Sequence, residues 1–391
     1  AAPGTPVAPA PDTSRLARLA GNLKFRSIGP ALTSGRIADV AVDPRNPKIW
    51  FVATAVGGVW KSTNAGTSFT PVFDGEGAYA TGAIAIDPKT PSTIWVGTGE
   101  NNAQRVVAYG DGVYRSIDGG ASWKNMGLRE SEHIGRILID PRDSKVLYVA
   151  SQGPLSNKGG DRGVYKSTDG GTTWARVLFV NEWTGANDIQ MDPRNPDVLV
   201  ATMWQRQRRT CCYVAGGPGA GVWRSTDAGK TWTKAQSGFP SDELGRIGLA
   251  ASPAQPGLLY AIAEAANNKG GTFRSRDFGA SWEKMSSYQS GSLYYNEIFA
   301  DPNVADRLYA VDVMLQVSND GGRTWGRVGE LLKHVDNHSV WIDPADSEHL
   351  IVGNDGGVYE SHDRGKSWRF CANLPLAQFY RVAVDDSKPF Y

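Results

Sequence analysis

Three arginines stand at the same place in a recurring phrase: Arg36 in SGRIADV, Arg136 in IGRILID and Arg246 in LGRIGLA. A guanidinium group holds a carboxylate through two parallel hydrogen bonds, so three of them around one space would form a pocket for an anion or a glycan. The alternative is that the arginines pair with carboxylates of the chain itself, such as Asp188 and Glu297, and fill that space with ion pairs. The sequence leaves both arrangements open.

In the other repeats, polar side chains occupy the position that the three arginines occupy in theirs. Two long segments contribute further polar groups to the same candidate site. The segment GTGENNAQRVVAYGDG contributes Glu100 and Arg105, and the segment MWQRQRRTCCYVAGGPGAG contributes Trp204. The second segment is long enough to lie over a binding site, although a solvated charged loop needs no such role. The candidate ligand-binding residues are Arg36, Arg136, Arg246, Asn187, His338, Glu100, Arg105 and Trp204.

The candidate catalytic groups are Glu297, Tyr295 and Asp188. Hydrolysis of a glycoside uses two carboxyl groups, or a tyrosine nucleophile next to a glutamate. Histidines beside carboxylates are a weaker metal candidate, and such scattered histidines are more often surface residues. The residues concerned are His133, His338, Glu132 and Asp336. The sequence indicates no metal and no cofactor, and it leaves open whether Ca²⁺ stiffens a loop.

The elements that must position these groups are repeats. One hairpin recurs seven times, as KSTNAGTSF from Lys61, RSIDGGASW from Arg115, KSTDGGTTW from Lys166, RSTDAGKTW from Arg224, RSRDFGASW from Arg274, VSNDGGRTW from Val317 and ESHDRGKSW from Glu360. An Asp in a tight turn accepts hydrogen bonds from N–H groups that the reversing chain leaves unpaired, and the Gly two residues later supplies a positive φ. We therefore expect a structural role for Asn64, Asp118, Asp169, Asp227, Asp277, Asp320 and Asp363. The competing interpretation, a set of catalytic or metal-binding acids, is weaker because acids that lie one per repeat around a ring cannot converge on one substrate atom.

A second phrase precedes each hairpin and consists of two apolar runs around an Asp-Pro turn, as in VAVDPRNPKIWFVAT from Val40. Its two strands and the two of the hairpin form a four-stranded antiparallel unit, so the expected fold class is an all-β propeller of seven blades. If the strands run from the inside outward, the starts of the first strands and the loops between second and third strands surround the channel mouth. The hairpin turns then lie on the opposite face. We expect the closing aromatic residues to pack between blades: Phe69, Trp123, Trp174, Trp232, Trp282, Trp325 and Trp368.

The hairpin resembles the Asp-box, or bacterial neuraminidase repeat, of sialidases, xyloglucanases, sortilin-type receptor ectodomains and the photosystem II assembly propeller. The phrases FRSIGPALTSGRIADVAVDP, ATAVGGVWKSTNAG and FYRVAVDD are most similar to large secreted bacterial proteins called sortilin-like or repeat-containing glycosyl hydrolases. For a sialidase, the resemblance implies that Tyr294 or Tyr295 acts with Glu297. For a xyloglucanase, it implies an Asp immediately before an Ile/Val-Gly-Gly sequence in the first blade. This chain has Ala55 there, before Val56-Gly57-Gly58, so that the two-acid mechanism lacks one partner.

Composition narrows the class of protein. A net charge of +1 over 391 residues argues against a general nucleic-acid binder, and no run approaches the roughly 18 apolar residues of a membrane helix. The Ala/Pro-rich start favours export after removal of a signal peptide, to a secreted, periplasmic or cell-surface location. We expect a flexible lead over residues 1–21, the propeller over 22–378, and the start of a further blade or second propeller over 379–391. The adjacent Cys211 and Cys212 are either a vicinal disulfide or two free thiols.

The leading functional hypothesis is an exported scaffold for binding or assembly, with a protein or glycan partner at the loop-rich mouth. The hypothesis rests on two observations: all seven repeats can be recognised, but the catalytic residues that the resembling enzyme families require are not all present. The alternative is a glycoside hydrolase, sialidase-like or other, that uses the carboxylates and arginines of the mouth. The partner's identity and the oligomeric state are not specified by the sequence.

Overall fold

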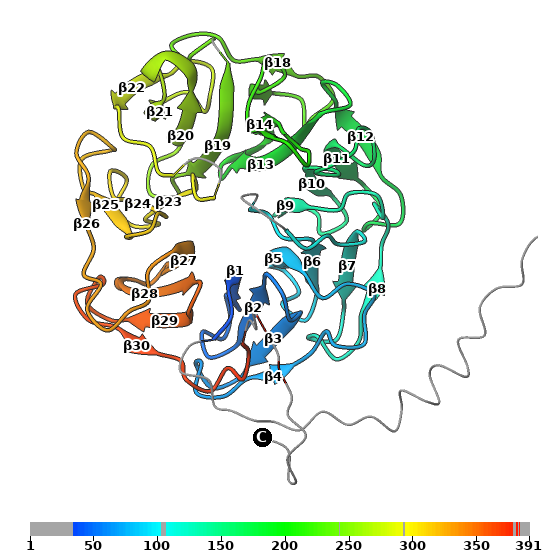
Figure 1. Cartoon of the computed structure of the whole chain (residues 1–391), viewed down its shortest axis with the longest axis vertical. Helices are drawn as coiled ribbons and strands as arrows, with labels where there is room; N and C mark the ends of the chain where they lie inside the picture. Colours follow the sequence, from blue (N-terminus) through cyan, green and yellow to red (C-terminus); the bar gives the residue numbers. More distant parts are fainter. Residues whose placement is uncertain are drawn as a thin grey trace, which may run out of the picture. The chain divides into compact units, whose positions relative to one another are not determined.

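The computed structural model describes residues 34–102, 107–241, 243–291, 294–377, 381 and 383. They form seven four-stranded antiparallel sheets arranged in a ring (Figure 1), which confirms the predicted all-β propeller. Among the described residues, no helix is long and apolar enough to cross a bilayer. The predicted lead, Arg105 and nearly all of segment 379–391 lie outside the described residues.

Each blade is built from consecutive strands, and its first strand lies next to the centre of the ring (Figure 1). Blades 1 and 2 comprise β1 (Ile37–Val42), β2 (Trp50–Thr54), β3 (Val59–Ser62), β4 (Thr70–Pro71), and β5 (Thr81–Ile86), β6 (Ile94–Thr98), β7 (Val113–Ser116), β8 (Lys124–Asn125). Blades 3 and 4 comprise β9 (Ile134–Ile139), β10 (Leu147–Ser151), β11 (Gly163–Ser167), β12 (Ala175–Leu178), and β13 (Thr184–Asp192), β14 (Asn195–Gln205), β17 (Gly221–Ser225), β18 (Thr233–Lys234). Blade 5 comprises β19 (Leu244–Ala251), β20 (Leu259–Ala265), β21 (Gly271–Ser275) and β22 (Glu283–Ser286). Blades 6 and 7 comprise β23 (Ile298–Ala300), β24 (Leu308–Ala310), β25 (Gln316–Ser318), β26 (Gly326–Arg327), and β27 (Asn337–Asp343), β28 (Asp346–Asn354), β29 (Gly357–Ser361), β30 (Arg369–Phe370). A two-stranded sheet, β15 (Gln207–Arg208) and β16 (Tyr213–Val214), lies in the long segment after Met203, and η1 (Ala266–Asn268) follows β20.

The hydrophobic core lies between the blades. Strands β2, β6 and β10 are buried at every residue, because each sheet packs against a neighbouring sheet on both faces. The outermost strands are short, and β4 is exposed. The apolar runs of the sequence therefore mark the middle strands of the blades.

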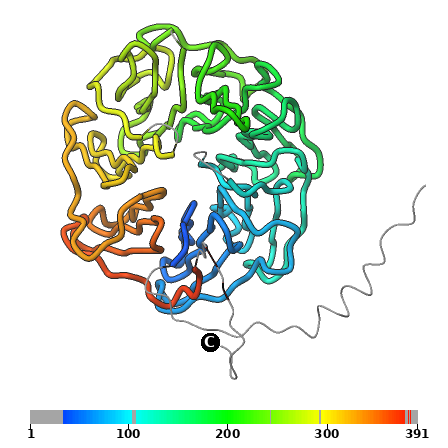
Figure 2. Tube along the Cα trace, viewed as in Figure 1, coloured from blue at the N-terminus to red at the C-terminus, as the bar shows by residue number. Residues whose placement is uncertain are grey.

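Blades 1 and 7 close the ring, so the blue and red parts of the trace lie side by side (Figure 2). The backbone N–H of Ser34 donates to the carbonyl of Gly356 at 2.8 Å. Ile37 and Trp50 of blade 1 share one buried cluster with Ile351 and Val358 of blade 7. Within the described residues, blades 1 and 7 thus contact each other directly and complete a ring of seven blades.

The recurring hairpin turn is held by its Ser and its Asp. In blade 3, Ser167 Oγ donates to Asp169 Oδ1 at 2.8 Å and accepts from the backbone N–H of Gly171 at 2.8 Å. Asp169 also accepts from the N–H and the hydroxyl of Thr173, and these two hydrogen bonds, with that from Ser167, lower its pKa to about 2. Asn64 accepts the same backbone bond in blade 1, from the N–H of Ser68. The repeated carboxylates thus have partners within their own turns.

The closing tryptophans connect neighbouring blades in several copies. Trp123 of blade 2 donates its Nε1–H to the carbonyl of Val72 at 2.6 Å, and Trp174 of blade 3 donates to that of Met126 at 2.8 Å. The indole rings therefore fix one blade to the preceding one.

Replacing Ser167 by Ala is expected to lower the free energy of unfolding by about 1–3 kcal/mol, because the buried N–H of Gly171 loses its acceptor. Thr168→Ala, at the exposed neighbouring position of the turn, is the control and should change it by less than about 0.5 kcal/mol. Denaturant unfolding of both variants tests this, and equal stabilities would contradict the role of the serine.

Candidate functional site

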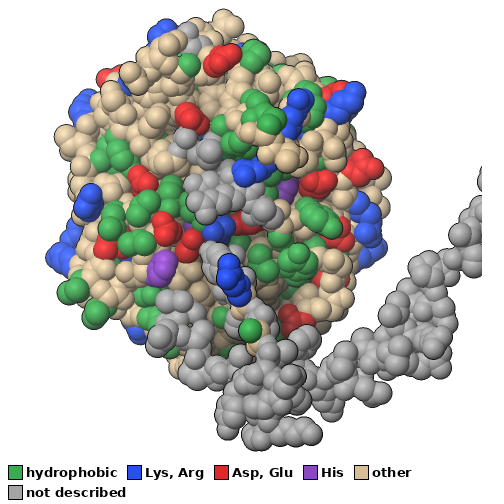
Figure 3. Space-filling model, viewed as in Figure 1, with side chains coloured by type: hydrophobic (Ala, Val, Ile, Leu, Met, Phe, Trp, Pro, Cys, Tyr) green, Lys and Arg blue, Asp and Glu red, His purple; other side chains and the backbone are tan. Residues whose placement is uncertain are grey.

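The predicted channel mouth is one end of the ring. Arg36, directly before β1, and Arg136 and Arg246, near the starts of β9 and β19, lie at the end where the second and third strands connect. The hairpin turns connect the third and fourth strands and lie at the opposite end. On the face seen in Figure 3, acidic, basic and His side chains lie around the centre of the ring.

Arg36 joins two carboxylates from the blades on either side of it. Its guanidinium forms an ion pair with Glu100 of blade 2, and its Nε lies 2.7 Å from Oδ1 of Asp355 of blade 7. The side chain of Glu100 is 4% exposed and that of Asp355 is 25% exposed. One buried and one partly open carboxylate therefore share a single cation.

Three donors surround Asp355. Besides Arg36, His338 contacts Oδ1 through Nε2 at 2.7 Å, and the hydroxyl of Tyr294 donates to Oδ2 at 2.9 Å. The side-chain N–H of Asn102 donates to Nδ1 of His338 at 3.2 Å, which places the ring proton on Nε2. Although burial favours the neutral acid, the hydrogen bonds from His338 and Arg36 hold the pKa of Asp355 well below its ordinary value.

Glu100 is shifted in the opposite direction. Burial raises the pKa of Glu100 above its ordinary value, and the charge of Arg36 offsets only part of this effect. Two neighbouring carboxyl groups whose pKa values move apart can divide the roles of acid and base between them. We call Arg36, Glu100, Asp355, His338 and Tyr294 the mouth cluster.

The other two arginines of the predicted trio are paired with different carboxylates. Arg136 Nε lies 3.0 Å from Oδ1 of Asp188, and Arg246 forms an ion pair with Glu297. In each pair the acid comes from the blade that follows. All three arginines thus face carboxylates of the chain, which is the second arrangement that the sequence left open.

Asp188, a candidate catalytic residue, connects two blades. Its Oδ2 accepts a hydrogen bond from the backbone N–H of Leu249 in β19 at 2.9 Å. Its Oδ1 accepts one from the backbone N–H of Ile189, the next residue in the chain. Asp39 does the same in blade 1, where it accepts the N–H of Ile84 in β5 at 3.1 Å. With both oxygens used in this way, these aspartates hold inner strands together.

Two further candidate ligand-binding residues have their polar atoms engaged. The side-chain amide of Asn187 donates to the carbonyl of Ile247 at 2.7 Å, and Trp204, 1% exposed, donates to that of Ala215 at 2.7 Å. The structure places both inside the ring wall rather than on the mouth surface.

The predicted pair of Tyr295 and Glu297 does not form. The hydroxyl of Tyr295 donates to Asp336, whereas Glu297 pairs with Arg246. Burial and this hydrogen bond raise the pKa of Tyr295, which is the reverse of what a nucleophilic phenolate requires.

The predicted metal-binding histidines are buried and have other contacts. His133 Nδ1 lies 2.9 Å from the carbonyl oxygen of Glu100, while His338 contacts Asp355 and Asn102. The expectation that they are surface residues is therefore wrong. His338 thus belongs to the mouth cluster, and His133 contacts the backbone of one of its members, Glu100.

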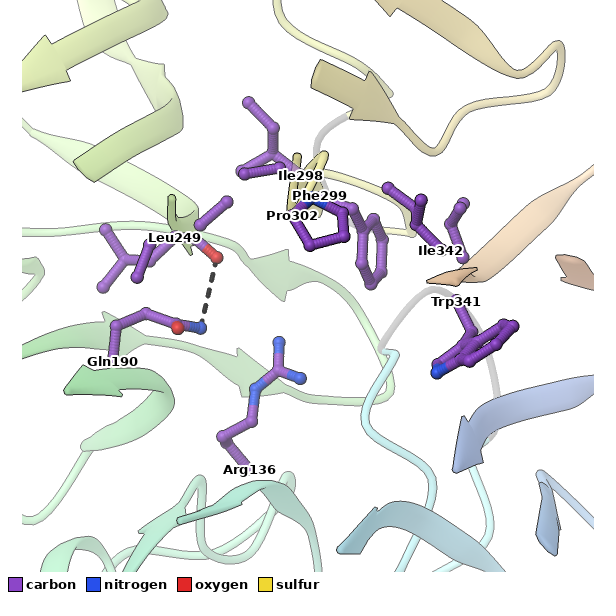
Figure 4. Close-up of a pocket in the computed structure, with 12 residues that line it drawn as sticks. Arg136, Gln190, Leu249, Ile298, Phe299, Pro302, Trp341 and Ile342 are labelled. Carbon is purple, nitrogen blue, oxygen red and sulfur yellow. Dashed lines mark hydrogen bonds between the residues drawn. The ribbon is translucent and has the colours of Figure 1, made fainter. Parts of the chain in front are cut away.

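A cavity of about 250 Å³ lies deeper in the channel, between the inner strands of blades 3 to 7 (Figure 4). Arg136, Gln190 and Trp341 contribute polar groups to it, and Gln190 donates to the carbonyl of Leu249 at 3.3 Å. No carboxylate is among the described residues that line it, whereas the mouth cluster holds two.

Asp355 and Asp39 are absent from the candidates of the sequence analysis. For Asp355 the signal was present, because the Asp of the phrase GNDGG lies between the second and third strands of its blade, as Glu100 does in the second repeat. For Asp39, nothing in the sequence distinguishes an acid that connects two strands from an acid that is exposed to solvent.

The chain is similar to enzymes over most of its length. No protein-family model matches it. The xyloglucanase of a Paenibacillus species is 25% identical over 347 aligned residues, covering 78% of this chain and 32% of that protein. The xyloglucanase of Hypocrea jecorina is 23% identical over 333 residues, covering 75% and 38%. The crystal structure of the GH74 xyloglucanase from Xanthomonas campestris superposes with a TM-score of 0.64 at 19% identity, over 88% of this chain and 55% of that chain, and shows the shared fold.

These similarities correct the leading functional hypothesis. The expectation of a scaffold for binding or assembly is wrong, because the curated relatives over three quarters of the chain are named as xyloglucanases. The alternative, a glycoside hydrolase, agrees better with them. The chain spans about a third of the length of the curated relatives it matches. The sortilin-like part of the resemblance stays a prediction.

Proposed function

We propose that this propeller is the catalytic region of a glycoside hydrolase that cleaves the backbone of a β-glucan such as xyloglucan. The observation that carries the proposal is the pair Glu100 and Asp355, which flank one guanidinium at the mouth and have pKa values shifted in opposite directions. The names of the relatives support the substrate class.

In this proposal Glu100 is the general acid and Asp355 is the base or nucleophile. The buried carboxyl of Glu100 gives its proton to the glycosidic oxygen as the bond to the anomeric carbon breaks. The ionised Asp355 either takes a proton from the attacking water or attacks the anomeric carbon itself. Arg36, His338 and Tyr294 are positioning residues that keep Asp355 charged and oriented.

The mouth cluster lies beside the position where the resemblance to xyloglucanases implies an Asp. Ala55, the residue at that position, donates its backbone N–H to the carbonyl of Arg36 at 3.0 Å. Since Ala55 has no carboxylate, the proposal assigns the missing acid function to residues that reach the same place from the neighbouring blades.

Exposed tyrosines at the same end of the ring offer faces for sugar rings. Tyr79 is 60% exposed in the connection to β5, and Tyr109 is 71% exposed in the loop between β6 and β7. An aromatic ring with an apolar face and a polar edge suits the mixed surface of a pyranose. We assign these two side chains to substrate binding.

Incubation of the chain with tamarind xyloglucan, with measurement of new reducing ends and product masses, tests the proposal. We expect oligosaccharide products from xyloglucan and none from aryl sialosides. The absence of products from xyloglucan and from other neutral β-glucans, together with unchanged migration in a native gel that contains xyloglucan, would contradict it.

A further inference from the structure

Blade 7 gathers three metal-ligating side chains on the face opposite the mouth. His349 comes from β28, Glu360 from β29, and His362 from the turn that follows β29. Their ligand atoms all lie within 4.8 Å of one another. Oε1 of Glu360 lies 3.0 Å from Nε2 of His349 and 3.5 Å from Nε2 of His362.

Two of the three ligands are held in place by further contacts. Nδ1 of His349 lies 3.0 Å from Oδ2 of Asp343, and Oε2 of Glu360 accepts from Nε of Arg369 at 2.8 Å. An acid on the second nitrogen of a histidine is the usual support of a metal-bound imidazole, because it fixes the ring and the tautomer. With their other polar atoms held in this way, Nε2 of His349 and Oε1 of Glu360 face each other as hydrogen-bond partners at 3.0 Å, and an ion would replace the proton between them.

His362 provides the open side of the group. Its side chain is 68% exposed, against 12% for His349 and 6% for Glu360, and its ring stacks on that of His349 with centroids 4.4 Å apart. Its Nε2 already lies 3.5 Å from Oε1 of Glu360, and its exposure leaves the side chain free to turn this nitrogen toward an ion held by the other two. Three protein ligands leave a fourth position for water.

The sequence of this repeat departs from the other six at two of the ligand positions. The residue before the turn serine is Lys or Arg in five of the other copies and Val in one, but Glu360 here. The residue after that serine is Thr in three copies and Ile, Arg or Asn in the others, but His362 here. The hairpin fold therefore requires neither residue, and both changes introduce a metal-ligating group.

We propose that His349, Glu360 and His362 bind one divalent transition metal ion of the Zn²⁺ class. Two imidazoles and one carboxylate suit Zn²⁺, Ni²⁺ or Cu²⁺, whereas Ca²⁺ and Mg²⁺ prefer oxygen ligands only. The ion connects β28, β29 and the turn between β29 and β30 in the blade that closes the ring, where Arg369 also donates to the carbonyl of Ala65 in blade 1 at 3.0 Å. The site stabilises this seam and is independent of the proposed hydrolysis at the mouth.

Titration of tag-free protein with ZnCl₂ by isothermal calorimetry tests the site. We expect saturable binding of one ion per chain and a Zn²⁺-dependent rise in the unfolding temperature. His362→Thr, which restores the residue found in three other repeats at an exposed position, should weaken binding at least tenfold, and Asp343→Asn should weaken it about 10–100-fold.

The matched control moves the imidazole to another blade. Thr168→His, added to His362→Thr, places a His on the equivalent turn of blade 3, where Lys166 stands in place of Glu360. This double variant should not recover binding. The inference is overturned if the wild type shows no saturable binding or if His362→Thr binds Zn²⁺ as tightly as the wild type. Xyloglucan hydrolysis by His362→Thr should equal that of the wild type.

Discussion

Glu100→Gln is expected to lower kcat for xyloglucan hydrolysis by about 10²–10⁴-fold, the usual contribution of a general acid. Gln has the size of Glu and can still accept from Arg36, so the fold is kept while the transferable proton is lost. Asp355→Asn should reduce kcat by a similar factor. Initial rates on xyloglucan, compared with circular dichroism and the unfolding temperature, separate lost catalysis from lost folding.

Asp74→Asn is the matched control for these variants. Asp74 is an exposed carboxylate in the connection between β4 and β5, which lies at the same end of the ring as the mouth cluster. Its removal changes the charge of that end by the same amount, and kcat should stay within about twofold of the wild type. A similar loss in all three variants would refute a specific role of Glu100.

The direction in which kcat/KM changes with pH follows from the pKa shifts of Glu100 and Asp355. Glu100 must be protonated, so kcat/KM falls as pH rises through its pKa, which burial places above the ordinary value of about 4.3. Asp355 must be ionised, and its lowered pKa keeps it so down to below about pH 3.9. The alkaline fall of kcat/KM should therefore disappear in the residual activity of Glu100→Gln.

The repeat and its turn chemistry were sufficient to predict the propeller. A Ser and an Asp at fixed spacing around a Gly determine one hairpin, and two apolar runs before it determine the inner strands, so every blade could be located by residue number. The seven blades were predicted, but whether they close the ring by themselves or with a further blade was left open, because closure depends on the twist between sheets that meet only in space.

The sequence predicted only some residues of the mouth cluster, because the ion pairs of the cluster join residues that lie far apart in the chain. Arg36, Glu100 and His338 were found because each stands at the start of an inner strand or in a loop at the same end. Their partner Asp355 lies 319 positions after Arg36 and reaches it only because the ring closes. An ion pair between adjacent blades could have been predicted from the sequence, because Asp188 follows Arg136 by 52 residues, which is about one repeat length.

Asp188→Ala is expected to lower the free energy of unfolding by about 3 kcal/mol, the lower end of the range for breaking a buried ion pair. The substitution leaves Arg136 without its partner and the buried N–H of Leu249 without an acceptor. Arg136 retains 25% exposure, and water at that exposed part keeps the cost from being larger. Urea denaturation gives the value directly.

The double variant Arg136→Met, Asp188→Leu tests whether this ion pair has a purely structural role or also binds the substrate. Replacing both members by apolar groups removes the unpaired charge, so more than half of the lost stability should return. If the pair only joins blades 3 and 4, hydrolysis per folded molecule also stays near the wild-type rate. A fall in activity at preserved stability would show instead that Arg136 contacts the glycan, and the catalytic region would then extend from the mouth cluster into the channel.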